Sequence, residues 1–251
     1  MTDANAIERS PAARHWGILG TIVWGAGVAL VFAGLQTAAM VAYVNHGRTG
    51  LSEDQFRALL DEAQTNGVLL SIATLLTASL CVPLILGIAK LKRGSRLRDY
   101  LAFRPVPLRT LGQWLGITAL FLLASDTLTW ALGRPVVPEF MKSAYASADP
   151  AWLLWLAFVL GAPLFEEIFF RGFLFKGLEG PIKPWGAIVA TSAVWSAIHV
   201  QYDLYGIGTI FVIGLLLGAA RRRTGSIFAP LAMHAFANLV ACTQVSLSLA
   251  R

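Results

Sequence analysis

The sequence predicts an all-α fold: a polytopic helical membrane protein with about seven transmembrane helices and a polar site inside the membrane. Of its 251 residues, 56% are hydrophobic and only 14% are charged, whereas roughly 25% of the residues in a soluble protein are charged. The hydrophobic residues gather into segments that approach the roughly 20 residues needed to cross a bilayer. A chain of this length leaves no room for a separate soluble domain.

The connectors between the spans predict the orientation. Lys and Arg are concentrated in connectors 90–109, 171–183 and 221–223, and cytoplasmic connectors are the ones that carry such an excess. We therefore expect a cytoplasmic N-terminus, an acidic connector around Glu53 on the outer side and an outer C-terminus. The seven expected spans are 16–44, 67–89, 110–132, 151–178, 185–203, 205–220 and 226–247.

Shorter signals divide and pack these segments. The stretch SEDQFRALLDEAQ predicts a helix outside the membrane or at its surface, with Ser52 as its N-cap. Pro181 and Pro184 separate the fourth span from the fifth. Gly214 and Gly218 permit close helix approach in the sixth span, and we expect them to pack within the bundle.

We expect one membrane domain, 1–251, in which 1–150 supplies three spans with their loops and 151–247 carries the motifs. The net charge of +6 lies mainly in cytoplasmic connectors, which favours lipid headgroups as partners and not nucleic acid. Cys81 and Cys242 each fall in an apolar segment, so no disulfide framework is expected. The first apolar run is longer than a signal-peptide core, so we expect an uncleaved first helix. The expected location is the bacterial inner (cell) membrane, crossed several times.

Glu166, Glu167 and Arg171 place three ionisable side chains inside the fourth expected span. A charge at bilayer depth costs roughly 2.5 to 3.5 kcal/mol, so such groups usually pair, line a wet cavity or perform chemistry. Glu167 and Arg171 are i,i+4 neighbours in the order that favours an ion pair, whereas Glu166 points about 100° away. One carboxylate is then neutralised and the other is a candidate general base. A structural ion pair without chemistry is the alternative.

Two later spans carry polar pairs at helical spacing. His199 follows Trp195 by one turn, and Asn238 follows His234 by one turn. A single histidine in a helix is more often a hydrogen-bonding residue of the core. This chain has just four histidines, and two of them lie in the membrane near an acid pair, so we expect a functional cluster.

The depth of these groups decides whether they can meet. Glu166 lies near the midpoint of its span and reaches the histidines only if the fourth helix continues past Arg171 to about Leu178. His199 lies outward of the midpoint of its own span. Asp126, a further polar residue in an apolar stretch, is expected to hydrogen-bond a neighbouring threonine near the outer interface, with a place at a cavity mouth as the alternative.

Two mechanisms fit these residues. In the first, Glu166, His199 and His234 bind one divalent ion such as zinc, which keeps an open position for water. In the second, Glu166 and His199 hold and deprotonate the water without a metal. His234 and Asn238 then stabilise the oxyanion. The sequence lacks HExxH, so it is not a zincin pattern, but a metal stays open.

Taken in order, these motifs resemble those of the CAAX-protease and bacteriocin-processing (CPBP or Abi) family of intramembrane endopeptidases, which includes the type II CAAX prenyl proteases. The resemblance covers about residues 150–245. Phenylalanine is the more usual residue at position 195, so Trp195 keeps an aromatic ring there. The motifs are Glu166-Glu167-x-x-x-Arg171, Trp195-x-x-x-His199 and His234-x-x-x-Asn238.

The resemblance implies a helical bundle with a membrane-embedded site that cleaves peptides near a membrane. It implies Glu166 as the base that activates water, paired with His199. It implies that His234 and Asn238 form the oxyanion site and that Glu167 and Arg171 support the catalytic groups. The family has been described as metalloproteases, so zinc remains an alternative to the glutamate mechanism. The resemblance also suggests a cytoplasmic opening, which conflicts with the outward depth of His199.

We therefore expect an endopeptidase that hydrolyses a peptide bond of a membrane-associated substrate, such as a prenylated protein, a leader peptide or the tail of a membrane protein. A non-catalytic scaffold or immunity protein that retains the protease fold is the alternative. A small transporter with a proton relay is a third hypothesis, although the inverted repeats that often mark transporters are not detectable in the sequence.

Overall fold

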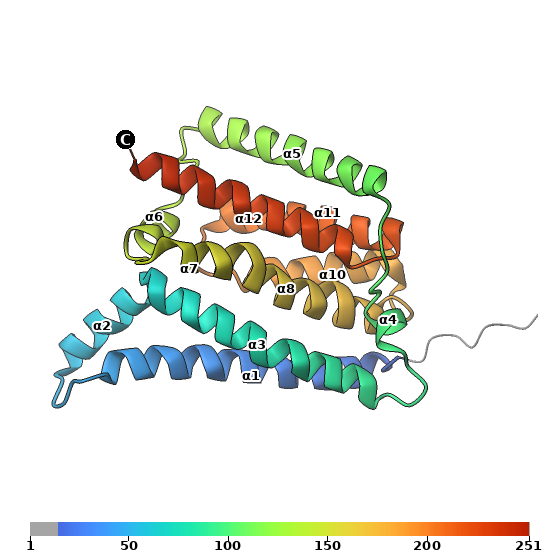
Figure 1. Ribbon diagram of the computed structural model, residues 1–251, viewed down its shortest axis with the longest axis horizontal. Coiled ribbons are helices and arrows are strands. Elements are labelled where there is room, and N and C mark those ends of the chain that lie inside the picture. Colours follow the sequence, from blue (N-terminus) through green and yellow to red (C-terminus); the bar gives the residue numbers. More distant parts are fainter. Residues whose placement is uncertain (1–14, 251) are drawn as a thin grey trace, which may run out of the picture.

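Six helices within residues 15–250, the part of the chain that this computed structural model describes, are long and apolar enough to cross a membrane. They are α1 (Ile18–Asn45), α3 (Gly67–Leu91), α5 (Leu108–Ala131), the run Ala151–Leu178, α11 (Leu204–Thr224) and α12 (Phe228–Leu249). Shorter helices between them are α2 (Glu53–Thr65), α4 (Leu97–Tyr100), α6 (Glu139–Ala146) and α10 (Lys183–Ala197) (Figure 1). No strand occurs in these residues, so the all-α polytopic fold is confirmed.

The predicted fifth span, 185–203, is shorter in the structure. α10 has 15 residues and ends at Ala197, so the expected count of seven spans is not confirmed. The chain turns at His199, whose N–H donates to a carbonyl of the last helical turn, and turns again at Tyr202. Asp203 then caps α11 by accepting a hydrogen bond from a backbone N–H of its first turn at 2.9 Å. His199 therefore lies in a turn beyond the end of α10.

The run Ala151–Leu178 is one helix with two π-helical stretches. Pro163 lacks a backbone N–H, and it lies five residues after Phe158, so the Phe158 carbonyl has no π-helical donor. The helix passes Arg171 and ends at Leu178, which confirms the continuation on which the predicted site depends. Its segments are α7 (Ala151–Trp155), η1 (Leu156–Gly161), α8 (Ala162–Glu166), η2 (Glu167–Leu174) and α9 (Phe175–Leu178).

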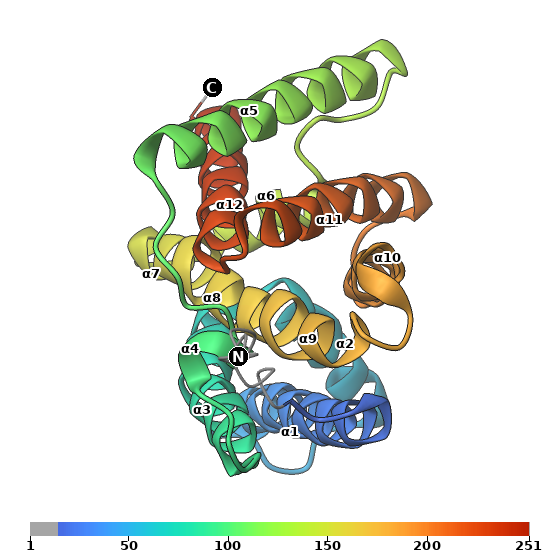
Figure 2. The ribbon, with the colours of Figure 1, turned by 90° about the vertical axis from the view of Figure 1, so that its right-hand side faces the viewer.

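The other helices pack around this run. α1 and α3 pair on one side of it, α11 and α12 lie on the other side, α10 lies beside α9 and α11, and α5 is outermost (Figure 2). A Cβ atom added to Gly218 would lie 2.7 Å from Ile188 of α10, and one added to Gly214 would lie 3.0 Å from Ser192. The glycine pair therefore lets α11 approach α10 inside the bundle, as predicted.

The predicted helix after the first span is α2, and it lies with α6 at one end of the bundle (Figure 1). The Ser52 hydroxyl accepts from the N–H of Gln55 at 3.3 Å, and the Gln55 side chain accepts from the N–H of Ser52 at 3.0 Å. This reciprocal capping box provides acceptors for two backbone N–H groups that have no acceptor within the helix. The Tyr43 hydroxyl at the end of α1 donates to Glu62 of α2 at 2.8 Å and holds the two helices together.

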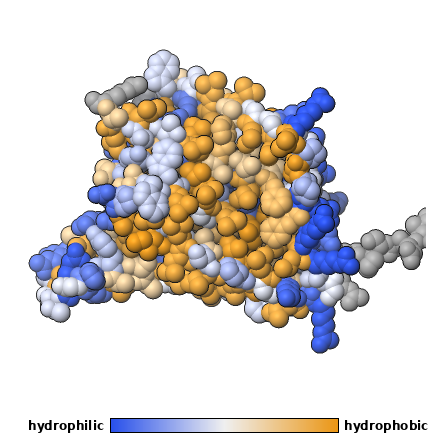
Figure 3. Space-filling model, in the orientation of Figure 1, coloured by the Kyte–Doolittle hydropathy of each residue, from blue (hydrophilic) through white to orange (hydrophobic). Residues whose placement is uncertain are grey.

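On the face that Figure 3 shows, apolar side chains form a broad belt between two more polar ends. On α5, for example, Leu120 and Leu123 are 69% and 66% exposed. Large apolar surfaces of this kind are rare on monomeric soluble proteins and match the hydrocarbon core of a bilayer. The chain is therefore an integral membrane protein that crosses the membrane several times.

Candidate active site

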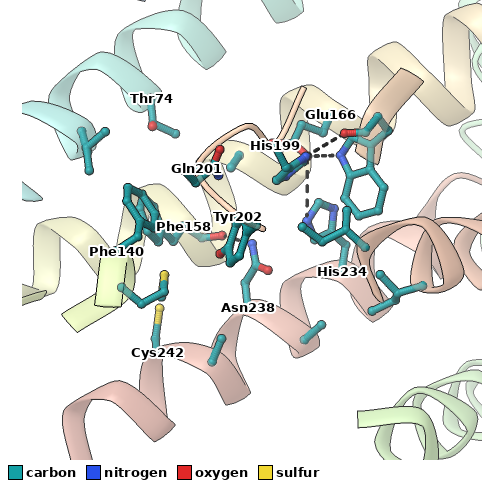
Figure 4. A pocket seen from close by; sticks show the side chains of 18 of the residues that line it. Thr74, Phe140, Phe158, Glu166, His199, Gln201, Tyr202, His234, Asn238 and Cys242 are labelled. Atoms are coloured by element: carbon teal, nitrogen blue, oxygen red, sulfur yellow. Dashed lines mark hydrogen bonds and ion pairs between the residues drawn. The ribbon is translucent and has the colours of Figure 1, made fainter. Parts of the chain in front are cut away.

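A cavity of about 290 Å³ lies among the helices that carry the predicted motifs. Figure 4 shows Glu166, His199 and His234 around one space, with Asn238 and Tyr202 beside it. Glu166 ends α8, His199 lies in the turn after α10, and His234 lies on α12. Folding thus brings together groups that are separated by more than thirty residues in the sequence.

Glu167 and Arg171 form the predicted ion pair behind this cavity. Arg171 Nη1 lies 3.1 Å from Glu167 Oε1, and both side chains are fully buried. The guanidinium also donates to the Gly214 carbonyl at 3.2 Å and lies over the Trp195 ring, 4.4 Å from its centroid. His234 Nδ1 lies 2.8 Å from the same Glu167 oxygen. These groups compensate one another, which matters because an unpaired buried charge costs several kcal/mol.

Glu166 is the next residue along the helix, but its surroundings differ. Its side chain is 17% exposed, whereas that of Glu167 is 0% exposed. Its Oε2 accepts a hydrogen bond from Trp195 Nε1 and lies 4.0 Å from His234 Nε2. No Lys or Arg side chain within residues 15–250 pairs with it. A phenylalanine at position 195 could not supply the indole donor.

His199 reaches the cavity from the turn after α10. Its Nδ1 lies 2.7 Å from the Trp195 carbonyl oxygen. A carbonyl can only accept, so Nδ1 carries the proton and the Nε2 of the neutral ring is an acceptor. The Trp195 ring meets both imidazoles edge to face, with centroid distances of 5.2 Å to His199 and 5.2 Å to His234. Trp195 therefore orients the carboxylate and packs against both histidines.

Asn238 is oriented by the irregular helix opposite it. Its Nδ2 donates to the Phe158 carbonyl at 2.7 Å. This is the carbonyl that Pro163 leaves without a π-helical donor, so the amide supplies the missing hydrogen bond. An asparagine amide has two N–H groups, and this bond uses one of them. The second N–H is available to a ligand in the cavity.

Tyr202, which belongs to none of the sequence motifs, also lines the cavity. Its ring centroid lies 6.3 Å from that of His199 and 6.2 Å from that of Phe140, and its hydroxyl has no hydrogen-bond partner within residues 15–250. Burial raises the pKa of Tyr202 to about 12, and the nearby Cys242 and Glu166 contribute in the same direction. The hydroxyl is therefore a donor at neutral pH. Its only signal in the sequence is its position three residues after His199.

A second cavity, of about 420 Å³, adjoins the first between α5 and the start of α11. Phe140, Gln201 and Tyr202 line both cavities. Asp126 lines the second one and accepts a hydrogen bond from Gln244 Nε2 at 2.6 Å. The expected hydrogen bond from a neighbouring threonine is therefore wrong, and the alternative, a place in the cavity wall, is the observed one.

Glu166, His199 and His234 are also the predicted metal ligands. Within residues 15–250, no three His, Cys, Asp or Glu side chains are arranged so that they could hold one metal ion. A zinc ion needs three protein ligands directed at one point, each about 2.0 to 2.2 Å away. The Nδ1 atoms of both histidines lie within hydrogen-bond distance of protein oxygens, so Nε2 is the atom that each could offer to a metal. In the described residues these three side chains are not gathered around one point, and zinc binding remains a prediction.

Comparison with known proteins identifies the family. Residues 148–240, which contain all seven motif residues, match the family described as type II CAAX prenyl endopeptidase Rce1-like. An Escherichia coli protein described as an uncharacterized 24.3 kDa protein is 31% identical over 185 residues, which cover 70% of this chain and 80% of that protein. No solved structure matches the chain. The chain belongs to the CAAX protease (CPBP) family.

Proposed function

We propose that this protein is an intramembrane endopeptidase that hydrolyses a peptide bond of a membrane-associated substrate inside the 290 Å³ cavity. One observation carries the proposal: Glu166 faces a cavity lined by two imidazoles and an amide, and no Lys or Arg within residues 15–250 neutralises it. A carboxylate with a purely structural role is expected to be paired, as Glu167 is. Membership of a peptidase family supports the same reaction.

Glu166 and His199 hold the attacking water in this mechanism. The acceptor Nε2 of His199 takes one hydrogen bond from the water, and the Glu166 carboxylate takes the proton. Trp195 donates to Glu166 Oε2, which leaves Oε1 for the water. The resulting hydroxide attacks the carbonyl carbon of the scissile peptide and forms a tetrahedral intermediate.

His234 and Asn238 stabilise the oxyanion of that intermediate. Asn238 offers its second Nδ2–H, and His234 offers Nε2–H when both ring nitrogens carry protons. Glu166 is protonated at this stage, so the Glu167 carboxylate, 2.8 Å from His234 Nδ1, balances the charge of the ring together with the oxyanion. Glu166 then gives its proton to the leaving amine, the C–N bond breaks, and the carboxylate is restored.

Mass spectrometry of peptide termini in membranes tests this proposal without a known substrate. Cells that express the wild type should contain new peptide N-termini in membrane-associated proteins. Glu166→Gln, His199→Ala and His234→Ala should each remove them while the protein still inserts. The matched controls are Asp61→Asn and His46→Ala, which change an exposed acid on α2 and an exposed imidazole beyond α1. Both controls should keep all of the new termini.

Retention of the wild-type termini by any of the three site variants would overturn the assignment. Identical termini in cells with the wild type, Glu166→Gln or no protein would show that the chain does not cleave peptides. That result would favour the non-catalytic scaffold.

A further inference from the structure

We infer that the cavity opens on the non-cytoplasmic side of the membrane, so that the substrate is a peptide segment that reaches the site from outside the cytoplasm. This inference rests on the proposed peptidase function of the cavity. Three features of the molecule support it: the charge of its two ends, the elements that line the cavity, and the packing beneath the site.

The two ends of the bundle differ in basic charge. Trp16 Nε1 donates to the Ile88 carbonyl at 3.0 Å, and the N–H of Ile227 donates to the Ala102 carbonyl at 3.0 Å. The starts of α1 and α12 and the end of α3 therefore meet at one end, here called the basic end. Its Lys and Arg residues are Lys90, Lys92, Arg93, Arg96, Arg98, Arg104, Arg109, Lys176, Lys183, Arg221, Arg222 and Arg223.

The opposite end holds α2 and α6, and among residues 15–250 it has four such residues: Arg48, Arg57, Arg134 and Lys142. Cytoplasmic connectors carry the excess of Lys and Arg in membrane proteins. The basic end, on the right in Figure 3, is therefore the cytoplasmic end. The α2–α6 end faces outward.

The cavity lies toward the α2–α6 end. Its wall includes Phe140 and Met141 of α6, Leu70 and Thr74 from the first two turns of α3, and Gln201 in the turn before α11. Each of these elements lies at or near the outer end. The second cavity, which shares part of this wall, continues toward the loop between α5 and α6.

The interior between the site and the basic end is filled. Phe170, Phe173 and Tyr100 are each at most 2% exposed, and the rings of Tyr100 and Phe173 stack at 5.8 Å. Arg221 Nε donates to the Arg171 carbonyl at 3.0 Å across the same region. Protein interiors of this kind are close-packed. A peptide could reach Glu166 from the cytoplasm only if this core opened.

The wall of the cavity indicates the kind of segment that fits. Of the Lys and Arg residues within 15–250, none lines it, and its wall combines apolar rings such as Phe140 and Phe158 with uncharged polar groups such as Gln201 and Tyr202. An uncharged, extended stretch of an exported peptide, or of the outer end of a membrane-anchored protein, matches this surface. The charged pair at the second cavity, Arg134 and Asp203 at 2.8 Å, lies nearer the outer water.

Cysteine accessibility tests the inference without a cleavage assay. In a chain that carries Cys81→Ser and Cys242→Ser, single cysteines are introduced as Thr49→Cys at the α2–α6 end, Gly180→Cys at the basic end and Thr74→Cys in the cavity wall. Thr49 and Gly180 are exposed, and a Cβ on Gly180 meets no other atom within 4 Å. The probe is a positively charged methanethiosulfonate reagent that does not cross membranes, added to intact or permeabilised cells.

We expect Thr49→Cys and Thr74→Cys to react in intact cells and Gly180→Cys to react only after permeabilisation. Reaction of Thr74→Cys only after permeabilisation, or in neither condition, would overturn the outward opening. Reaction of Thr49→Cys only after permeabilisation would overturn the orientation itself. The labelling needs no catalysis and can be repeated in Glu166→Gln, so its failure and the failure of the proposed peptidase function give different results.

Discussion

Two faces of the helix 151–178 carry neighbouring carboxylates with opposite surroundings. Glu167 is 0% exposed, and its Oε1 lies 3.1 Å from Arg171 and 2.8 Å from His234. Glu166 is 17% exposed, faces the cavity, and receives one hydrogen bond from Trp195. A step of one residue thus separates a neutralised acid from a free one. The paired carboxylate is suited to stabilise the site, and the unpaired one is left to exchange protons.

The largest expected effect is the loss of catalytic activity when Glu166, on the cavity face, is changed. Glu166→Gln should lower kcat by about 10²- to 10⁴-fold, the usual contribution of a general base. The amide has nearly the same shape, and its oxygen can still accept from Trp195, so the melting temperature in detergent should not change. A large drop in melting temperature together with residual activity would show that Glu166 has the same structural role as Glu167, and the contrast would be lost.

The next effect is on the stability of the buried face. Arg171→Met leaves the Glu167 carboxylate buried without its cation, which should lower the free energy of unfolding by about 3–5 kcal/mol. The double variant Glu167→Gln/Arg171→Met removes both charges and should recover most of that loss. Chemical denaturation in detergent micelles measures each value.

The matched control is Arg57→Met, which breaks an i,i+4 pair with Glu53 whose side chains are 70% and 77% exposed. A pair that exposed contributes little, so this variant should stay close to the wild type. A double variant no more stable than Arg171→Met alone would mean that shape, and not charge, explains the loss. The proposed division between the two faces would then be wrong.

The sequence was sufficient to predict the buried face and much of the cavity. The ion pair of Glu167 with Arg171 depends on i,i+4 spacing within one helix, which is a local property. The membrane fold likewise depends on segment length and composition, and six of the seven expected spans are present. The motif order was enough to select Glu166, His199, His234 and Asn238 as neighbours.

The contacts that orient the cavity groups could not be predicted, because they join distant segments. Asn238 meets Phe158 across 80 residues, and only the structure shows that Pro163 leaves that carbonyl free. The early end of α10 moves His199 from a helix into a turn, which in turn brings Tyr202 to the cavity. Turn chemistry of this kind depends on a few hydrogen bonds and overrides an apolar pattern that would otherwise extend the span.

Tyr202→Phe tests whether the cavity face holds a further donor. If the hydroxyl helps to stabilise the oxyanion, its loss should lower kcat by about tenfold. This is less than the roughly 10²- to 10³-fold loss that follows removal of a principal oxyanion-hole donor. Because the pKa of Tyr202 is raised to about 12, the factor should be constant from about pH 6 to pH 9. Tyr205→Phe is the control, because the Tyr205 hydroxyl bonds Thr129 and does not line the first cavity. Equal activity of Tyr202→Phe and wild type would exclude a role for the hydroxyl.

The raised pKa of Tyr202 also predicts a stability change with pH. The neutral phenol is favoured in the folded state, so its contribution is fully present below about pH 10 and is lost as the pH rises through about 12. The wild type should therefore lose more stability than Tyr202→Phe between these values. Thermal unfolding at pH 9 and pH 11 measures the difference, and parallel losses in the two proteins would contradict the assigned burial.

The smallest expected effect lies at the residue that joins the two faces. Trp195 donates to Glu166 on the cavity side and lies over Arg171 on the buried side. Trp195→Phe keeps an aromatic ring but removes the N–H, so Glu166 loses the donor that fixes its direction. We expect kcat to fall about fivefold, equivalent to roughly 1 kcal/mol for one hydrogen bond, with KM unchanged. The melting temperature should also fall, because the smaller ring fills the buried site less well and loses the contact with Arg171. Trp152→Phe, a change at an indole that is 63% exposed on α7, is the control. A Trp195→Phe protein that loses stability but not kcat would place the indole in the buried network alone, because its link to Glu166 would then have no effect on catalysis.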